Sequence, residues 1–151
     1  NNIMAWYECK VTHDVMIEDC VKTLTEPYLV EALSVTEAAT RITAELEGDG
    51  DVTIEGVTRK RFQEVFLEEG EWEHPFYLAK VALTTLDEKS GTEREQTFCY
   101  LIEAETLKDA MQRLEAELRG GVSDWELLSL SKSPIVEVIT GLRTIPATTT
   151  E

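Results

Sequence analysis

The sequence predicts an α+β fold built by internal duplication of a β-β-α-β unit. The segment from about residue 6 to 66 is echoed by the segment from about 76 to 139. Trp6 to Val11 aligns with Phe76 to Val81, and Tyr28 to Ala32 aligns with Tyr100 to Ala104. Apolar residues recur at period two in the first of these pairs and at helical spacing after the second, which indicates strands followed by a helix in each half.

The first strand of each half is predicted to have one apolar face. Tyr7, Cys9 and Val11 alternate with charged residues, and the aligned residues from Tyr77 onward repeat this alternation. The second strands, Pro27 to Ala32 and Thr97 to Ala104, are more continuously apolar. Continuous apolar character favours a central position in the sheet.

A hairpin is expected between the first two strands of the second half. Asp87 to Thr92 is a polar run that contains Gly91. Glycine readily adopts the positive φ angle that a four- or five-residue hairpin loop requires.

One helix is predicted in each half. Ser34 with Glu37, and Thr106 with Asp109, place a hydroxyl at the N-cap and a carboxylate three residues later, which is the capping-box pattern. Each is followed by an apolar stripe at helical spacing and then by glycines that can end the helix. The stripes are Val35, Ala38, Ala39, Ile42 and Leu46, and Leu107, Ala110, Met111, Leu114 and Leu118; the glycines are Gly48, Gly50, Gly120 and Gly121.

The chain is long enough for one domain, and we expect residues 1–139 to form it with a shared core. Within it, residues 67–75 form an acidic connector between the two repeats. Two pseudo-two-fold-related antiparallel sheets and one shared sheet are both compatible with the pattern. Residues 140–151 lack periodicity and are predicted to be a disordered tail.

The chain is strongly acidic, with 30 Asp and Glu against 14 Lys and Arg and a formal net charge of −16. Such a field repels phosphate groups, so nucleic acid and anionic membranes are disfavoured as partners and a basic protein is favoured. Arg59, Lys60 and Arg61 are the one basic cluster. We interpret this cluster first as a solvated strand edge that discourages strand pairing. The alternative is that it contacts phosphate.

Three cysteines cannot close a disulfide framework, which favours a reducing cytoplasm. No apolar run reaches the length of a membrane span, and no signal-peptide pattern opens the chain. Cys9 and Cys99 are predicted to be buried small hydrophobes, and Cys20 to be exposed. Cys9, His13 and Cys20 are too widely spaced to predict a zinc site, so no metal or cofactor is expected.

No catalytic motif is recognisable. Neither histidine, His13 or His74, lies in a pattern with a serine or cysteine nucleophile. The glycine pairs lack the lysine and following helix of a phosphate-binding loop. A non-enzymatic protein is therefore predicted.

The acidic connector is the candidate partner-binding segment. In the structural interpretation, the segment is only a connector and Trp72 packs back onto the core. In the functional one, an aromatic residue surrounded by charge forms a recognition loop, as at many protein interfaces. The candidate residues are Glu68, Glu69, Glu71, Trp72, Glu73 and His74.

Several segments carry a resemblance to an uncharacterised family. These segments are Trp6 to Val11, Thr25 to Ser34, Thr36 to Ala38 and Leu86 to Gly91. Over nearly the whole chain, from Trp6 to about Val138, the sequence resembles domain of unknown function 4494, a family of short proteins from Bacteroidota and their phages. The resemblance implies a cytoplasmic or phage-borne soluble protein and implies no activity, cofactor or catalytic residue.

Two classes of function stay open. The favoured class is a protein-interaction module, with a nucleic-acid mimic as its special case. The alternative is a single-strand nucleic-acid binder that stacks bases on aromatic rings. An enzyme with a cleft between the halves ranks third, and free sheet edges make a homodimer a further prediction. The candidate stacking rings are Trp6, Tyr28, Phe76, Tyr100 and Trp125.

Overall fold

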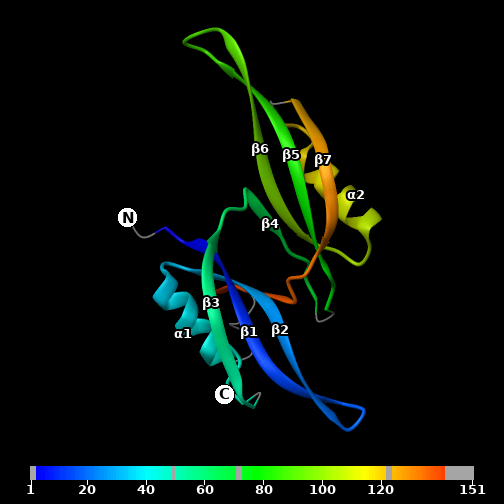
Figure 1. The fold of residues 1–151 in the computed structure, drawn as a ribbon. Coiled ribbons are helices and arrows are strands. Elements are labelled where there is room, and N and C mark those ends of the chain that lie inside the picture. Colours follow the sequence, from blue (N-terminus) through cyan, green and yellow to red (C-terminus); the bar gives the residue numbers. More distant parts are fainter. Residues whose placement is uncertain (1–2, 49, 71–72, 122–123, 142–151) are drawn as a thin grey trace. The chain divides into compact units, whose positions relative to one another are not determined.

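The computed structural model describes residues 3–48, 50–70, 73–121 and 124–141. The chain divides into two compact units. The first unit contains residues up to Arg61 and from Pro134 onward, and the second unit runs from Phe62 to Ser133. Among the described residues, these units contain two four-stranded sheets and two helices (Figure 1), which confirms the α+β class.

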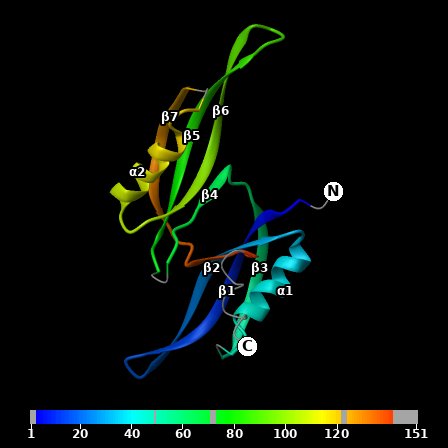
Figure 2. The same ribbon diagram turned by 180° about the vertical axis from the view of Figure 1, so that it is seen from behind.

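The first unit has the strand order β3-β1-β2-β8. Pairing is antiparallel except between β2 and β8, which are parallel. The helix α1 covers one face of this sheet (Figure 2), where its Ala38 and Ile42 join Tyr7, Cys9 and Val11 in a buried cluster. The bounds are β1 Ala5–Ile17, β2 Cys20–Ala32, α1 Val35–Glu45, β3 Val52–Lys60 and β8 Glu137–Ile139.

The second unit has the strand order β4-β6-β5-β7, again with one parallel pair, β4 with β6. The helix α2 contributes Ala110 and Leu114 to a second buried cluster with Ala79, Val81 and Ile102. The bounds are β4 Glu64–Phe66, β5 Phe76–Asp87, β6 Thr92–Glu103, α2 Leu107–Leu118 and β7 Asp124–Ser133.

The short parallel strand of each sheet comes from the other half of the sequence. β4 follows β3 in the chain but pairs with β6 in the second unit. β8 follows β7 but pairs with β2 in the first unit. The segments 6–66 and 76–139 therefore do not each build a sheet of their own, and each sheet is completed by a strand of the other segment. Residues 1–139 as one domain with a shared core stay a prediction.

The first hairpin is much longer than the strands that the sequence predicted. β1 and β2 pair from Ala5 with Ala32 out to Ile17 with Cys20, and the turn consists of Glu18 and Asp19, with φ of 50° and 66°. Positive φ at both turn residues is the conformation of a type I′ hairpin, for which Asn and Gly are the usual residues. The sequence carried no glycine here to indicate the turn.

The second hairpin matches its prediction. Asp87 pairs with Thr92, so four residues form the loop, and Gly91 has a φ of 74°. The backbone N–H of Gly91 donates to the carbonyl oxygen of Asp87 at 2.7 Å.

Both predicted helix caps are confirmed. The Ser34 hydroxyl accepts from the backbone N–H of Glu37 at 3.1 Å, and the Thr106 hydroxyl accepts from that of Asp109 at 3.0 Å. The predicted apolar stripes were too wide, because Val35, Leu107 and Met111 are exposed. Only a narrow part of a helix surface faces a sheet, and residues spaced four apart occupy it.

Within the described ranges, no helix has both the length and the apolar character needed to cross a bilayer. Thr140, the first residue of the predicted tail, is buried. Residues 142–151 lie outside the described part of the chain.

Candidate functional site

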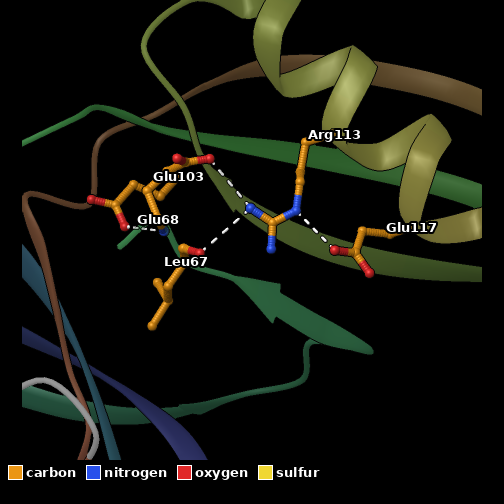
Figure 3. Close-up of polar contacts among 5 residues, drawn as sticks. All are labelled: Leu67, Glu68, Glu103, Arg113 and Glu117. Atoms are coloured by element: carbon orange, nitrogen blue, oxygen red, sulfur yellow. Dashed lines mark hydrogen bonds and ion pairs between the residues drawn. The ribbon is translucent and has the colours of Figure 1, made fainter. Parts of the chain in front are cut away.

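The acidic connector begins at a fixed point on the second unit. The backbone N–H of Glu68 donates to the carboxylate of Glu103 at 2.9 Å, and the Glu68 carboxylate pairs with Arg113 of α2 at 3.3 Å. Figure 3 shows Glu68 held between these two side chains. Glu103 is only 1% exposed. A buried carboxylate needs hydrogen-bond donors, so its bond to the Glu68 backbone restricts where the connector starts.

Arg113 of α2 contacts the start of the connector, its own helix and β4. Its guanidinium donates to the carbonyl oxygen of Leu67 at 3.4 Å and to Glu117 at 2.8 Å (Figure 3). It also lies over the ring of Phe66, 5.4 Å from the ring centroid. The pair with Glu68 is partly exposed, so the ion pair itself stabilises the fold by about 0–1 kcal/mol. Its main consequence is positional, because one planar cation sets the direction of residues 66–68.

The connector ends beside the point where it starts. The backbone N–H of Ala104 donates to the carbonyl oxygen of Pro75 at 3.1 Å. Glu103 and Ala104 are consecutive residues, so adjacent groups at the end of β6 hold both ends of the connector. The segment is therefore a loop closed at its base, a geometry common among functional surface loops.

The described side chains of this loop differ in their availability. Glu69 and Glu73 are exposed, and His74 is half-buried. Glu68 is engaged by Arg113 and so acts within the unit. Glu71 and Trp72 lie outside the described residues.

The basic cluster lies on an edge strand. Arg59 and Lys60 end β3, which is one of the two edge strands of the first sheet, and all three basic residues are exposed. Lys60 pairs with Glu8 at 3.3 Å. Neighbouring residues of a strand point to opposite faces, so Arg59 and Lys60 do not gather on one surface. This arrangement agrees with a charged edge that discourages strand pairing.

The five candidate stacking rings do not form one exposed surface. Phe76 and Tyr100 are buried, with 2% and 3% of their surface exposed. Tyr100 stacks on Phe66 with ring centroids 5.9 Å apart, and burial, with a smaller contribution from Glu64, raises the pKa of its hydroxyl. Trp6, Tyr28 and Trp125 are half-buried. The two buried rings are unavailable for base stacking.

The three cysteines have different surroundings. Cys9 is buried and Cys20 is exposed, as predicted, whereas Cys99 is half-buried. The His13 ring interacts with the Glu26 carboxylate, with 2.8 Å between the ring Nε2 and the carboxylate oxygen. Within the described ranges, no group of three or more His, Cys, Asp or Glu side chains has a geometry that could hold a metal ion.

We expect Cys9 to be unreactive in the folded protein. Burial, with a smaller contribution from Glu8, raises the pKa of its thiol from 9.0 to about 11. Thiolates are the reactive species, so a thiol reagent at pH 8 should label Cys20 at least about 100-fold faster than Cys9. Mass spectrometry of the labelled peptides measures both rates. Comparable labelling of the two residues would contradict the buried environment.

The raised pKa also predicts a pH dependence of stability. The folded state favours the protonated thiol, so the contribution of Cys9 is complete below pH 9 and is lost as the pH rises toward 11. Two pKa units correspond to about 2–3 kcal/mol. Relative to Cys9→Ala, the wild-type free energy of unfolding should fall by roughly this amount between pH 9 and 11. Parallel curves for the two proteins would contradict it.

Residues of α1 and of the turn that follows it line a shallow depression, formed by Ala39, Thr40, Thr43, Ala44 and Glu47. These side chains supply hydroxyls and one carboxylate but no arrangement of nucleophile and base. No reaction can be assigned to this surface.

A family model described as "Domain of unknown function (DUF4494)" matches residues 5–141. The chain belongs to this family. The DUF4494 match covers every strand and helix of both units, including the connector and β8. No curated protein and no solved structure gives a significant match to the chain.

Proposed function

We propose that this DUF4494 protein is a non-enzymatic protein-interaction module whose acidic connector binds a basic partner. The observation that carries the proposal is the closure of the connector at its base. Glu103 and Ala104 hold its two ends, so the connector starts and finishes at neighbouring fixed points. A segment whose two ends are anchored loses less conformational entropy on binding than a free segment does.

The charge of the loop defines the partner. Glu69 and Glu73 are exposed, and Glu71 lies between them in the sequence. In a chain with a formal net charge of −16, these groups add to a field that attracts Lys and Arg and repels phosphate. In this proposal, Glu69, Glu71 and Glu73 contact the partner together with Trp72 and His74. Glu68 then acts as the residue that positions the loop.

The test replaces the three loop carboxylates with amides, in Glu69→Gln/Glu71→Gln/Glu73→Gln. Tagged wild-type and variant proteins are incubated with lysate of the host cells at low and high salt. We expect the wild type to retain a basic protein at near-stoichiometric amounts at low salt and to lose it at high salt, because surface charge pairs are screened. The loop variant should retain at most about a tenth as much at low salt.

The matched control removes the same charge from another exposed surface. Glu88, Glu93 and Glu95 lie on the second hairpin and are exposed. Replacing these three with Gln changes the net charge equally and should leave partner retention near the wild-type level. Equal losses in both variants would show that net charge alone drives binding, and unchanged retention in the loop variant would exclude the loop.

We also infer that the two halves arose by duplication of one unit. Several features support this at positions aligned in the sequence. The bulge between Lys10 and Val11 in the first sheet corresponds to the bulge between Lys80 and Val81 in the second. Both helices begin with a hydroxyl cap, at Ser34 and at Thr106. The strand order also corresponds. The second sheet, written in reverse as β7-β5-β6-β4, places the aligned strands in the same order as β3-β1-β2-β8 in the first sheet.

A cytoplasmic location and an origin in Bacteroidota or their phages complete the proposal. Three cysteines that form no disulfide among the described residues support the location. Lysates of Bacteroidota, with and without phage infection, are accordingly the source of partner proteins for the test. A partner that itself binds nucleic acid would favour the nucleic-acid mimic as the particular form of this function.

A further inference from the structure

The tip of the first hairpin carries exposed apolar side chains that belong to neither buried cluster. β3 pairs with β1 no further than His13, so residues 14–23 form a two-stranded ribbon, which we call the first arm. Figures 1 and 2 show this ribbon projecting from the sheet of the first unit. On it, Met16, Ile17 and Val21 are 70%, 45% and 65% exposed.

The apolar residues occupy both faces of the first arm. Met16 is opposite Val21, and Ile17 is opposite Cys20. Successive residues of a strand point to opposite faces, so these two pairs lie on opposite sides of the ribbon. The pairing with β3 ends at His13, and the side chains of both pairs are exposed. The exposed surface is therefore a wedge that is apolar on both sides.

The second hairpin shows that such an arm does not need an apolar tip. β7 pairs with β5 no further than Thr84, so residues 85–94 form a corresponding ribbon, the second arm. Leu86 is the one exposed large apolar side chain of this arm, whose residues are all described. The rest are mainly threonine and charged residues. The fold of the arm thus leaves the apolar residues of the first arm without a structural role.

Acidic residues accompany the apolar wedge. Asp14, Glu18 and Asp19 lie on the first arm, against one basic residue, Lys22. An anionic tip disfavours insertion into an anionic lipid surface, and it also disfavours contact with the same tip of a second copy. A groove that is apolar inside and bordered by Lys or Arg satisfies both the apolar and the acidic side chains.

We propose that the first arm is a second interaction surface, which inserts Met16, Ile17 and Val21 into an apolar groove bordered by basic residues on a partner protein. Burial of these side chains on a partner removes apolar surface from water and so favours association. This surface belongs to the first unit, whereas the acidic connector belongs to the second, and it does not depend on the function proposed for the connector.

The experiment places a photo-crosslinking residue, benzoylphenylalanine, at Val21 of the full chain and, as a matched control, at Glu93 of the second arm. Both proteins are irradiated in host cells, and the crosslinked peptides are mapped by mass spectrometry. We expect the Val21 position to crosslink to one protein, at an apolar surface flanked by Lys or Arg, and the Glu93 position not to do so.

Binding of that protein then distinguishes the side chains. Met16→Thr/Val21→Thr should weaken its affinity about tenfold or more, and Leu86→Thr should leave it unchanged. Both variants replace exposed residues, so the melting temperatures should stay close to that of the wild type. Crosslinks to a second copy of the chain, to lipid or to no molecule would overturn the proposal, as would an unchanged affinity of the double variant.

Discussion

Cutting the chain inside the connector should leave two fragments that remain bound to each other. The fragment up to Gly70 carries β4, which pairs with β6, and the remaining fragment carries β8, which pairs with β2. Separation would expose Phe66, Val138 and Ile139, all buried in the intact chain. Their burial, with the backbone pairing, stabilises the complex by on the order of 5–10 kcal/mol.

The measurement uses a specific protease site inserted after Gly70 and size-exclusion chromatography after cleavage. The cut protein should elute at the volume of the intact chain and separate only in denaturant. The same cut in a Phe66→Ala/Ile139→Ala background should release the fragments, because each sheet then loses an apolar contact of its exchanged strand. Two separate peaks from the cut wild-type protein would show that strand exchange does not hold the fragments together.

Replacing Phe66 by Ala should destabilise the second unit by about 3–5 kcal/mol, the usual cost of removing a buried aromatic ring. Phe66 is 7% exposed, stacks on Tyr100 and lies beneath the Arg113 guanidinium. Its loss therefore removes core volume, a ring contact and a cation–π contact together. Urea denaturation gives the change in the free energy of unfolding.

The destabilisation caused by Phe66→Ala should be located in the second unit. Hydrogen exchange should accelerate in β6 and α2, although residue 66 belongs to the first half of the sequence. The matched control is Val65→Ala at the adjacent, half-buried position, which should cost roughly 1 kcal/mol. Faster exchange confined to β1 and β2, or equal effects of the two substitutions, would contradict the assignment of β4 to the second sheet.

Local elements were predictable from the sequence wherever a local interaction decides them. The hydroxyl caps at Ser34 and Thr106 need only groups three residues away, and Gly91 needs only its own freedom at positive φ. The sequence did not locate the turn at Glu18 and Asp19, because the preference of Asp for positive φ is weaker than that of Gly and Glu has none. The pairing of β1 with β2 imposes their conformation. Local signals were weakest where cross-strand contacts override them.

The candidate site was predictable in composition and not in geometry. A run of acidic residues between the halves indicated a surface loop. The engagement of Glu68 by Arg113, 45 residues later in the chain, had no signal in the sequence, and neither did the anchoring of both loop ends at Glu103 and Ala104. These contacts join distant segments, so only the fold brings their atoms together.

The sequence by itself determined the α+β class, the helix starts, the second hairpin and the acidic character of the connector, because periodicity, capping and charge act within a few residues of each other. Only the tertiary structure decided which strand completes which sheet. Glu64–Phe66 and Glu137–Ile139 are similar apolar edge strands, and each could satisfy the pattern of either sheet. β4 pairs with β6 and β8 pairs with β2. Both pairings join segments far apart in the sequence, so no local signal could indicate them.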